Sequence, residues 1–434
     1  MRRKQISILF VFLILSTWAG AQEKLSLDIQ SAKDYALNFN KSIKNSGLAI
    51  EQSQEKIREA IASGLPQVNA TTDYTNALGA EISIQFDESL PPTKIPIKPT
   101  SNFNLQVGQL IFNGSFIVGV QTAKIYKKIT EKGKEKTEQE IVSQLVESYY
   151  LALLSEEALT ILSSNVENLT TVYNKTKPMV SVGMMEKVEL DQLEVQLNSL
   201  NNSVKAAERQ LEMAKNVLRF QLGVDSETEL ELTDKLADIL ADSNIQSMIG
   251  DDFNIVNNVD FQLTTLQEEI SAKQVELQKA AYLPSLTGYY SFTKKILKPA
   301  FDMSPANVVG MQMNIPVFSS GERRSKVRQA KIDLETTQNN KEILEDQLTL
   351  QYKQLKFNLI SAFEAYATQK RSVEVSREVY NSLRNKYDQG MISSLDLTSA
   401  DNNYLNAESN YISAMMEVLK AQNDLNTLTG TILN

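Results

Sequence analysis

The segment IPVFSSGERRSKVRQAK, residues 315–331, changes from the pattern of a strand to that of a charged helix across three residues, Ser-Ser-Gly. Just before this change, in NVVGMQMNI, residues 307–315, apolar and polar side chains alternate, which is typical of a strand with one apolar face. The segment LQVGQLIFNGSFIVGVQTAK, residues 105–124, shows the same change at Gly114. Two such transitions indicate an internal repeat.

Similar residues recur at a fixed separation in the two halves of the chain. Three pairs lie 207 residues apart: QTAK and RQAK, Gly183 and Gly390, and Gly223 and Gly430. Upstream of the strands the separation is 218 residues, as between Asn40 and Asn258. The 11 additional residues of the first half fall in an interval that contains the proline-rich ESLPPTKIPIKP, residues 88–99, which predicts a long loop.

Each half therefore predicts a helix, two strands joined by a loop, and a long helical hairpin. In both long helices apolar residues alternate at spacings of four and three, beginning at Ile141 and at Leu348, which is the periodicity of a coiled coil. The predicted division of the chain has four parts: a signal peptide at 1–21; a first repeat at 22–224, with strands at about 66–78 and 101–112 and a hairpin at about 115–222; a connecting segment at 225–254; and a second repeat at 255–434, with strands at about 284–294 and 307–318 and a hairpin at about 321–429.

The strand pattern predicts a membrane barrel that one chain cannot close. Four strands are fewer than the roughly 8 of the smallest membrane barrels, so several chains must share one barrel. The transitions at Gly114 and Gly321 would then mark the membrane boundary. Five residues are predicted at this junction of barrel and helices: Phe112, Gly114, Pro316, Phe318 and Gly321.

The N-terminus predicts export. Arg2, Arg3 and Lys4 precede an apolar run that ends at an Ala-Gly-Ala site, so we expect a signal peptide cut after Ala21. The chain has no cysteine, which leaves neither disulfides nor a cysteine for a lipid anchor. Without the three basic leader residues the formal charge of −9 becomes about −12, which argues against a nucleic-acid partner.

Enzymatic activity is the least favoured class. The sequence has no histidine, which excludes Ser-His triads and HExxH zinc sites. It also has no glycine-rich phosphate-binding motif. We therefore expect no catalytic residue, no cofactor and no metal site.

Several segments resemble those of the TolC-type outer-membrane efflux protein family. These are GLPQV and YLPSL before the strands, IPVFSSGERRSKVRQAK after them, and YDQGMISSLDLTSADNNYLNAE at the second hairpin turn. The resemblance implies a homotrimer with a shared transmembrane barrel in the outer membrane, continuous with a helical coiled-coil tunnel in the periplasm. It also implies the exit duct of a tripartite efflux or type I secretion system. The partners would be a periplasmic adaptor, an inner-membrane pump of the RND or ABC type, and outer-membrane lipid.

The resemblance also implies a periplasmic aperture near the second hairpin turn. The first of the family's two acidic positions falls on Asp396, whereas the second falls on Ser399, with Asp401 and Asp388 nearby. Three copies of Asp396 would form a carboxylate ring that attracts cations. In the alternative interpretation Asp396 only caps its helix together with Ser393.

The hairpin tips are candidates for docking the adaptor. The residues concerned are Gly183, Met184, Met185, Gly390, Met391 and Ile392. The alternative is local packing between the tips, and Glu186 and Glu189 are expected to be solvated first-turn acids. For the whole chain, the competing function is a secreted or periplasmic helical scaffold or adaptor without a pore.

Overall fold

The computed structural model describes residues 24–85, 91–242, 245–250, 252–298 and 304–433, so the predicted leader at 1–21 lies outside it. The chain forms two compact units. The first comprises the described residues of 1–47, 133–262 and 344–434, and the second comprises those of 48–132 and 263–343. No helix in the described part of the chain combines the length and the apolar character needed to cross a bilayer.

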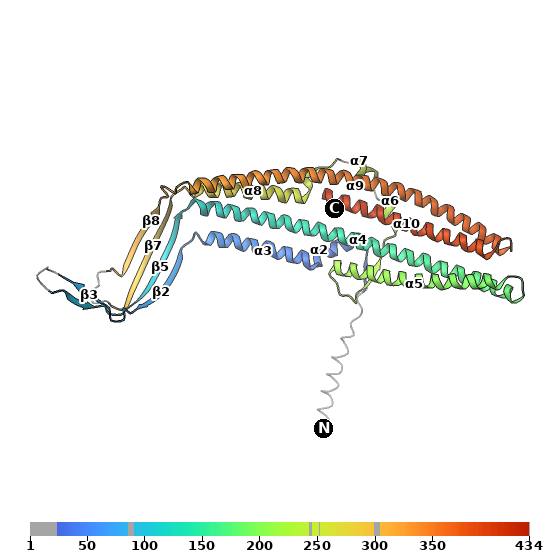
Figure 1. Ribbon diagram of the computed structural model, residues 1–434, viewed down its shortest axis with the longest axis horizontal. Helices are drawn as coiled ribbons and strands as arrows, with labels where there is room; N and C mark the ends of the chain where they lie inside the picture. The colour runs from blue at the N-terminus through green and yellow to red at the C-terminus, as the bar shows by residue number, and fades with distance from the viewer. Residues whose placement is uncertain (1–23, 86–90, 243–244, 251, 299–303, 434) are drawn as a thin grey trace, which may run out of the picture. The chain divides into compact units, whose positions relative to one another are not determined.

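The second unit contains an antiparallel sheet with the strand order β2-β5-β7-β8, as Figure 1 shows. Its strands are β2 (Gln67–Thr75), β5 (Thr100–Phe112), β7 (Ser285–Leu297) and β8 (Asn307–Asn314). Strands from the two repeats meet where β5 pairs with β7. The outer strands of this sheet, β2 and β8, each pair on one side only within the described residues.

The two faces of this sheet differ in polarity. One row of directly opposed residues crosses all four strands and is apolar: Val68, Val107, Tyr290 and Val309. On the other face Asp73 accepts hydrogen bonds from Asn102 Nδ2 (3.0 Å) and Asn104 Nδ2 (3.2 Å). Thr293 extends this polar row by donating to Asn104 Oδ1 at 2.8 Å. The alternation of the sequence thus produces one lipid-compatible face and one water-compatible face.

Two local features of this unit differ from the sequence prediction. The proline-rich interval is not wholly a loop, because β3 (Glu81–Ile84) pairs with β4 (Thr93–Pro96) as a separate two-stranded sheet. In addition, β8 ends at Asn314, so Pro316 and Phe318 follow the strand rather than belonging to it. Pro316 has no N–H to give to a strand partner, which favours an early end.

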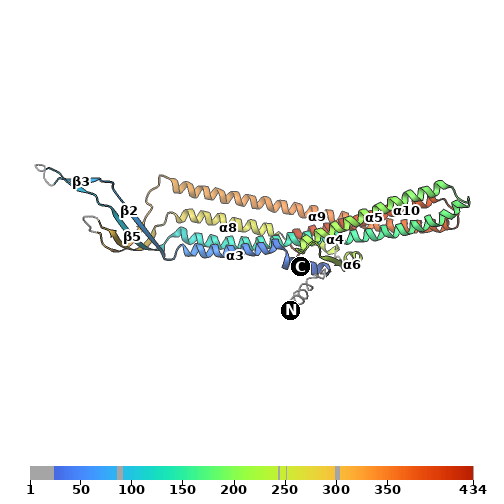
Figure 2. The ribbon, with the colours of Figure 1, turned by 90° about the horizontal axis from the view of Figure 1, so that it is seen from below.

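Two antiparallel helical hairpins, which belong to the first unit from residues 133 and 344 onward, are the longest elements of the described chain (Figures 1 and 2). One is formed by α4 (Gly114–Ser181) and α5 (Lys187–Leu222), and the other by α9 (Glu322–Asp388) and α10 (Ser394–Thr429). Every position of the two predicted coiled-coil stripes is buried or half-buried. The stripes supply core residues such as Leu145, Leu169 and Leu359.

Shorter elements make up the rest of the described chain. Its remaining helices are α2 (Ile29–Phe39), α3 (Lys41–Ala62), α6 (Leu236–Asp242), α7 (Ile245–Gly250), the 3-10 turn η2 (Ile255–Asn257) and α8 (Val259–Ala280). A short parallel sheet pairs β1 (Lys24–Leu27) with β6 (Glu229–Leu232). This sheet joins the start of the described chain to the connecting segment.

The repeat is visible as a duplicated asparagine contact. Asn40 is buried and donates to Gln221 O at 2.8 Å, while its Oδ1 accepts from Ser42 N at 2.8 Å. Asn258 is also buried; it donates to Leu428 O at 2.9 Å and accepts from Asp260 N at 3.0 Å. Each asparagine therefore caps the start of one helix and fastens it to the last turn of another.

We expect Asn258→Ala to lower the free energy of unfolding by about 2 kcal/mol, because it removes a helix cap and leaves the Leu428 carbonyl without its buried partner. Thermal unfolding followed by circular dichroism measures this. Asn201→Ala is the matched control, since this side chain is exposed and, among the described residues, bonds only to a carbonyl of its own helix. Equal stability of the two variants would show that the contact contributes nothing.

Candidate functional site

The tips of the two hairpins have the same backbone geometry. Gly183 and Gly390 have φ values of 77° and 73°, in the left-handed region that favours glycine. After each glycine the chain closes a Schellman motif, in which Met184 N donates to Met179 O (2.8 Å) and Met391 N to Lys386 O (2.9 Å). The predicted turn glycines therefore end their helices.

The predicted docking residues fall into two groups. Met184 and Met391 are 76% and 67% exposed, whereas Met185 and Ile392 pack against the core formed by Leu193, Leu397 and their neighbours. Each tip thus presents one exposed methionine next to one packed apolar side chain.

Glu189 joins the tips rather than being solvated, so the expectation for this residue was wrong. Its Oε2 accepts hydrogen bonds from Ser394 Oγ at 2.8 Å and from Ser394 N at 3.4 Å, and Ser394 is buried. Thr176 and Tyr387 share a further hydrogen bond of 2.5 Å between the hairpins. These contacts hold the start of α5 and the end of α4 to the other hairpin.

Asp396 forms the predicted helix cap. Ser393 Oγ accepts from Asp396 N at 3.2 Å, and the Asp396 carboxylate accepts from Ser393 N, also at 3.2 Å. The side chain of Asp396 is exposed, and it lines a shallow cleft together with Ser399, Val379 and Leu383. A cap and an exposed charge are therefore both present at this residue.

The other two predicted aperture residues have surroundings that differ from those of Asp396. Asp388 is held in an ion pair with Lys175, with 2.9 Å between Oδ1 and Nζ. Asp401 is buried and faces α5, where Gln196 Nε2 lies 3.4 Å from its Oδ2. Burial, reinforced by the charge of Glu408, raises the pKa of Asp401 to about 6. Of the four, Asp396 and Ser399 line the same exposed cleft.

The predicted junction residues mark the transitions between sheet and helices. Helix α4 begins at Gly114, where a Cβ would lie 2.8 Å from Leu283 Cδ1. Gly321 has a φ of 87° one residue before α9, and the carbonyl of Pro316 accepts from Arg323 Nη1 at 2.9 Å. Phe112 and Phe318 are exposed, so neither packs into the chain at this point.

A duplicated chain with four amphipathic strands and two long helical hairpins has the architecture of an outer-membrane channel subunit. The chain belongs to the outer membrane efflux protein family, whose family model matches residues 34–224 and 254–431.

Relatives and solved structures agree with this membership. The chain is 21% identical over 381 residues to the probable outer membrane lipoprotein SilC of Salmonella typhimurium, covering 84% of this chain and 77% of that protein. It is 19% identical to TolC of Escherichia coli K12 over 415 residues, covering 91% of this chain and 80% of TolC. The CmeC channel of Campylobacter jejuni superposes with a TM-score of 0.71 at 18% identity, covering 93% of this chain and 85% of CmeC. VceC of Vibrio cholerae superposes with a TM-score of 0.72 at 14% identity, covering 93% of this chain and 96% of VceC.

The fold class predicted from the sequence is confirmed, since the chain is mainly α with duplicated helix, strand, strand and long-hairpin units and four strands of the barrel type. The functional prediction is confirmed as well: the chain is an outer membrane efflux channel, and the alternative of a scaffold or adaptor without a pore is set aside. The family and its structural neighbours are channel proteins, not enzymes.

Proposed function

We propose that three copies of the chain form one passive export duct, in which the sheets close a shared outer-membrane barrel and the hairpins line a tunnel across the periplasm. The observation that carries this proposal is the sheet with one apolar and one polar face. In lipid the free edges of β2 and β8 need partners, and neighbouring copies of the same sheet supply them.

Exposed apolar stripes on the helices support association with further copies. On α9, Ile343, Leu350 and Phe357 recur every seven residues and are all exposed. On α5, Val188 and Val195 have the same spacing and are also exposed. Stripes at a seven-residue repeat pack against neighbouring helices in coiled coils, so we assign them to the contacts of the trimer.

Transport through this duct requires no chemistry in the chain. Three copies of Asp396, close to Ser399, form a carboxylate ring at the periplasmic aperture that attracts cations. The energy comes from an inner-membrane pump of the RND or ABC type. Relatives named for secretion of proteases and for export of toxins and drugs support an export role.

The hairpin tips are proposed to dock the periplasmic adaptor. The exposed Met184 and Met391 provide unbranched, adaptable apolar contacts, while Gly183 and Gly390 set the shape of the turns. The leader at 1–21 is proposed to direct export, and the trimer then resides in the outer membrane.

Single-channel conductance of the purified trimer in a planar bilayer tests the duct. We expect discrete, stable steps, and we expect Asp396→Asn to lower the ratio of cation to anion permeability severalfold, because three carboxylates leave one constriction. The control is Asp191→Asn, which removes an exposed carboxylate elsewhere on a tip helix. If the conductance steps and their ion selectivity are unchanged in Asp396→Asn, this residue acts only as a helix cap. If a folded trimer gives no conductance steps, the proposal of a duct is wrong.

A further inference from the structure

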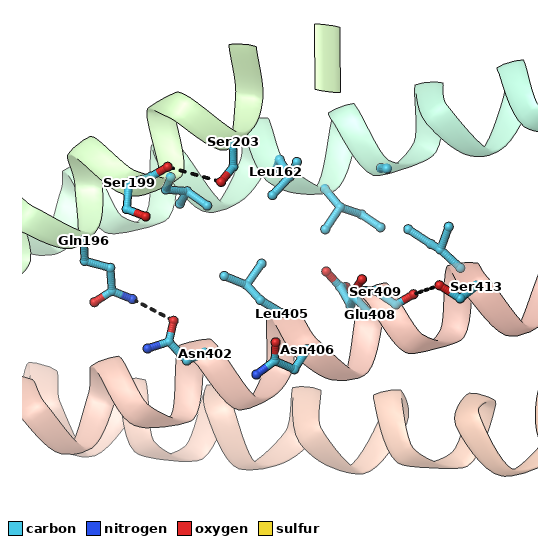
Figure 3. A pocket seen from close by; sticks show the side chains of 14 residues that line it. Leu162, Gln196, Ser199, Ser203, Asn402, Leu405, Asn406, Glu408, Ser409 and Ser413 are labelled. Atoms are coloured by element: carbon cyan, nitrogen blue, oxygen red, sulfur yellow. Dashed lines mark hydrogen bonds between the residues drawn. The ribbon is translucent and has the colours of Figure 1, made fainter. Parts of the chain in front are cut away.

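A cleft of about 380 Å³ lies between the two hairpins of one chain, away from the tips (Figure 3). Leu162 of α4, Leu200 of α5 and Leu405 and Ile412 of α10 form apolar parts of its wall. Serine and amide side chains form the rest, among them Ser199, Ser203 and Asn402. A cleft of this size, with both apolar and polar side chains in its wall, suits a small amphiphilic organic molecule.

Glu408 is the charged residue of this cleft. The residue is only 5% exposed, and Figure 3 shows its side chain extending from α10 among the lining side chains. Its Oε1 lies 3.6 Å from Arg377 Nη2, but its Oε2 is buried and has no hydrogen-bond partner within the described residues. A buried carboxylate oxygen without a partner is costly, so the site favours a ligand that donates to it.

A second acceptor in the cleft is also free. The amide of Gln196 is oriented by its Nε2, which lies 3.4 Å from both Asp401 Oδ2 and Asn402 Oδ1. The other polar atom of this amide, Oε1, is buried and has no hydrogen-bond partner in the part of the chain that the structure describes. Both unpaired atoms of the cleft lining are acceptors, which selects for a ligand with N–H donors.

Arg377 is the cation that pairs with Glu408, through one carboxylate oxygen. Arg377 is mostly exposed, and its Nε donates to Tyr404 Oη at 3.0 Å. On the α5 side, Asp401 adds a second buried carboxylate, and Arg384 is directed to Asn168 Oδ1 at 3.2 Å. Burial raises the pKa of Tyr404, so this hydroxyl stays neutral and adds no charge.

We propose that this cleft binds an organic monocation, namely an ammonium group carried on an apolar body. The ammonium donates to the buried Glu408 Oε2 in a charge-assisted bond, and the apolar body lies against the leucine side chains. All lining residues belong to one chain and one unit, so the site exists independently of the proposed carboxylate ring at the aperture.

Isothermal titration of the intact trimer in a neutral detergent with 4-phenylbutylamine tests the site, with heats from protein-free micelles subtracted. We expect saturable binding at one site per chain, and at least tenfold weaker binding to Glu408→Gln. The alcohol 4-phenylbutanol has the same apolar body without the charge, and we expect it to bind weakly and equally to both proteins. Glu194→Gln on α5, an exposed residue, is the matched control and should bind like the wild type.

A second variant tests the site with its carboxylate retained. Asn406 is exposed at the edge of the cleft, so Asn406→Trp fills the volume while Glu408 stays in place. We expect this variant to lose binding of the amine as well. Saturable binding that both variants retain, equal affinity for the alcohol, or no binding to the wild type would each overturn the proposal.

Discussion

Tyr149→Ala is expected to lower the free energy of unfolding by about 4 kcal/mol, which is the range for deleting a large aromatic side chain from a core. Tyr149 is 0% exposed, and its hydroxyl lies 2.8 Å from Asp234 Oδ2 and 3.1 Å from Leu27 O. Asp234 also accepts from Ile29 N at 2.7 Å. One tyrosine of α4 therefore connects β1, the start of α2 and the connecting segment.

Two further substitutions separate packing from hydrogen bonding at this position. Tyr149→Phe keeps the ring and loses only the hydroxyl, so we expect a loss of about 1–2 kcal/mol. Tyr126→Ala is the control, because Tyr126 lies on the same helix but is exposed. Thermal unfolding followed by circular dichroism ranks the three variants. If the stability lost in Tyr149→Ala lies within 1 kcal/mol of that lost in Tyr126→Ala, then Tyr149 is not a central packing residue.

The long helices could be predicted because their determinants are local. The seven-residue repeat fixes which face of α4 and α9 is buried, and the stripe positions from Ile141 and from Leu348 are indeed covered. Gly183 and Gly390 could be assigned to turns for the same reason, since a positive φ is a property of a single residue. Alternation within the strands likewise predicted the two faces of the sheet.

Contacts between distant segments could not be predicted from local patterns. The hydrogen bond from Ser394 to Glu189 joins residues that are 205 positions apart, and no sequence pattern at either residue predicts this contact. The parallel pairing of β1 with β6 has the same character, because each strand has only four residues. Both were absent from the sequence prediction because short elements are specified by tertiary packing.

The grouping of Asp401 with Asp396 shows how proximity in sequence differs from proximity on a helix. Five residues at about 100° each place the two side chains roughly 140° apart around α10. Asp396 consequently lies on the exposed surface, whereas Asp401 points to α5 and is buried. The helical repeat of α10, rather than distance along the chain, decides which acid is available at the surface.

Asp401→Asn is expected to stabilise the folded chain by up to about 3 kcal/mol at pH 7.5. Burial raises the pKa of Asp401 from 3.8 to about 6, so the folded state prefers the neutral acid. At pH 7.5 the carboxylate is ionised and its burial lowers stability, by about 1.36 kcal/mol for each unit of the pKa difference. An asparagine has nearly the same shape and carries no charge to desolvate.

The pH dependence gives this prediction its sign. Because the pKa is higher in the folded state than in the unfolded state, the wild type should lose stability as the pH rises from about 4 to about 6, and should change little above that from this group. The advantage of Asp401→Asn should therefore be full at pH 7.5 and close to zero at pH 4. Apparent melting temperatures at both pH values, with Asp191→Asn as the exposed control, measure the difference. An equal shift at both pH values would assign the effect to packing and not to the buried charge.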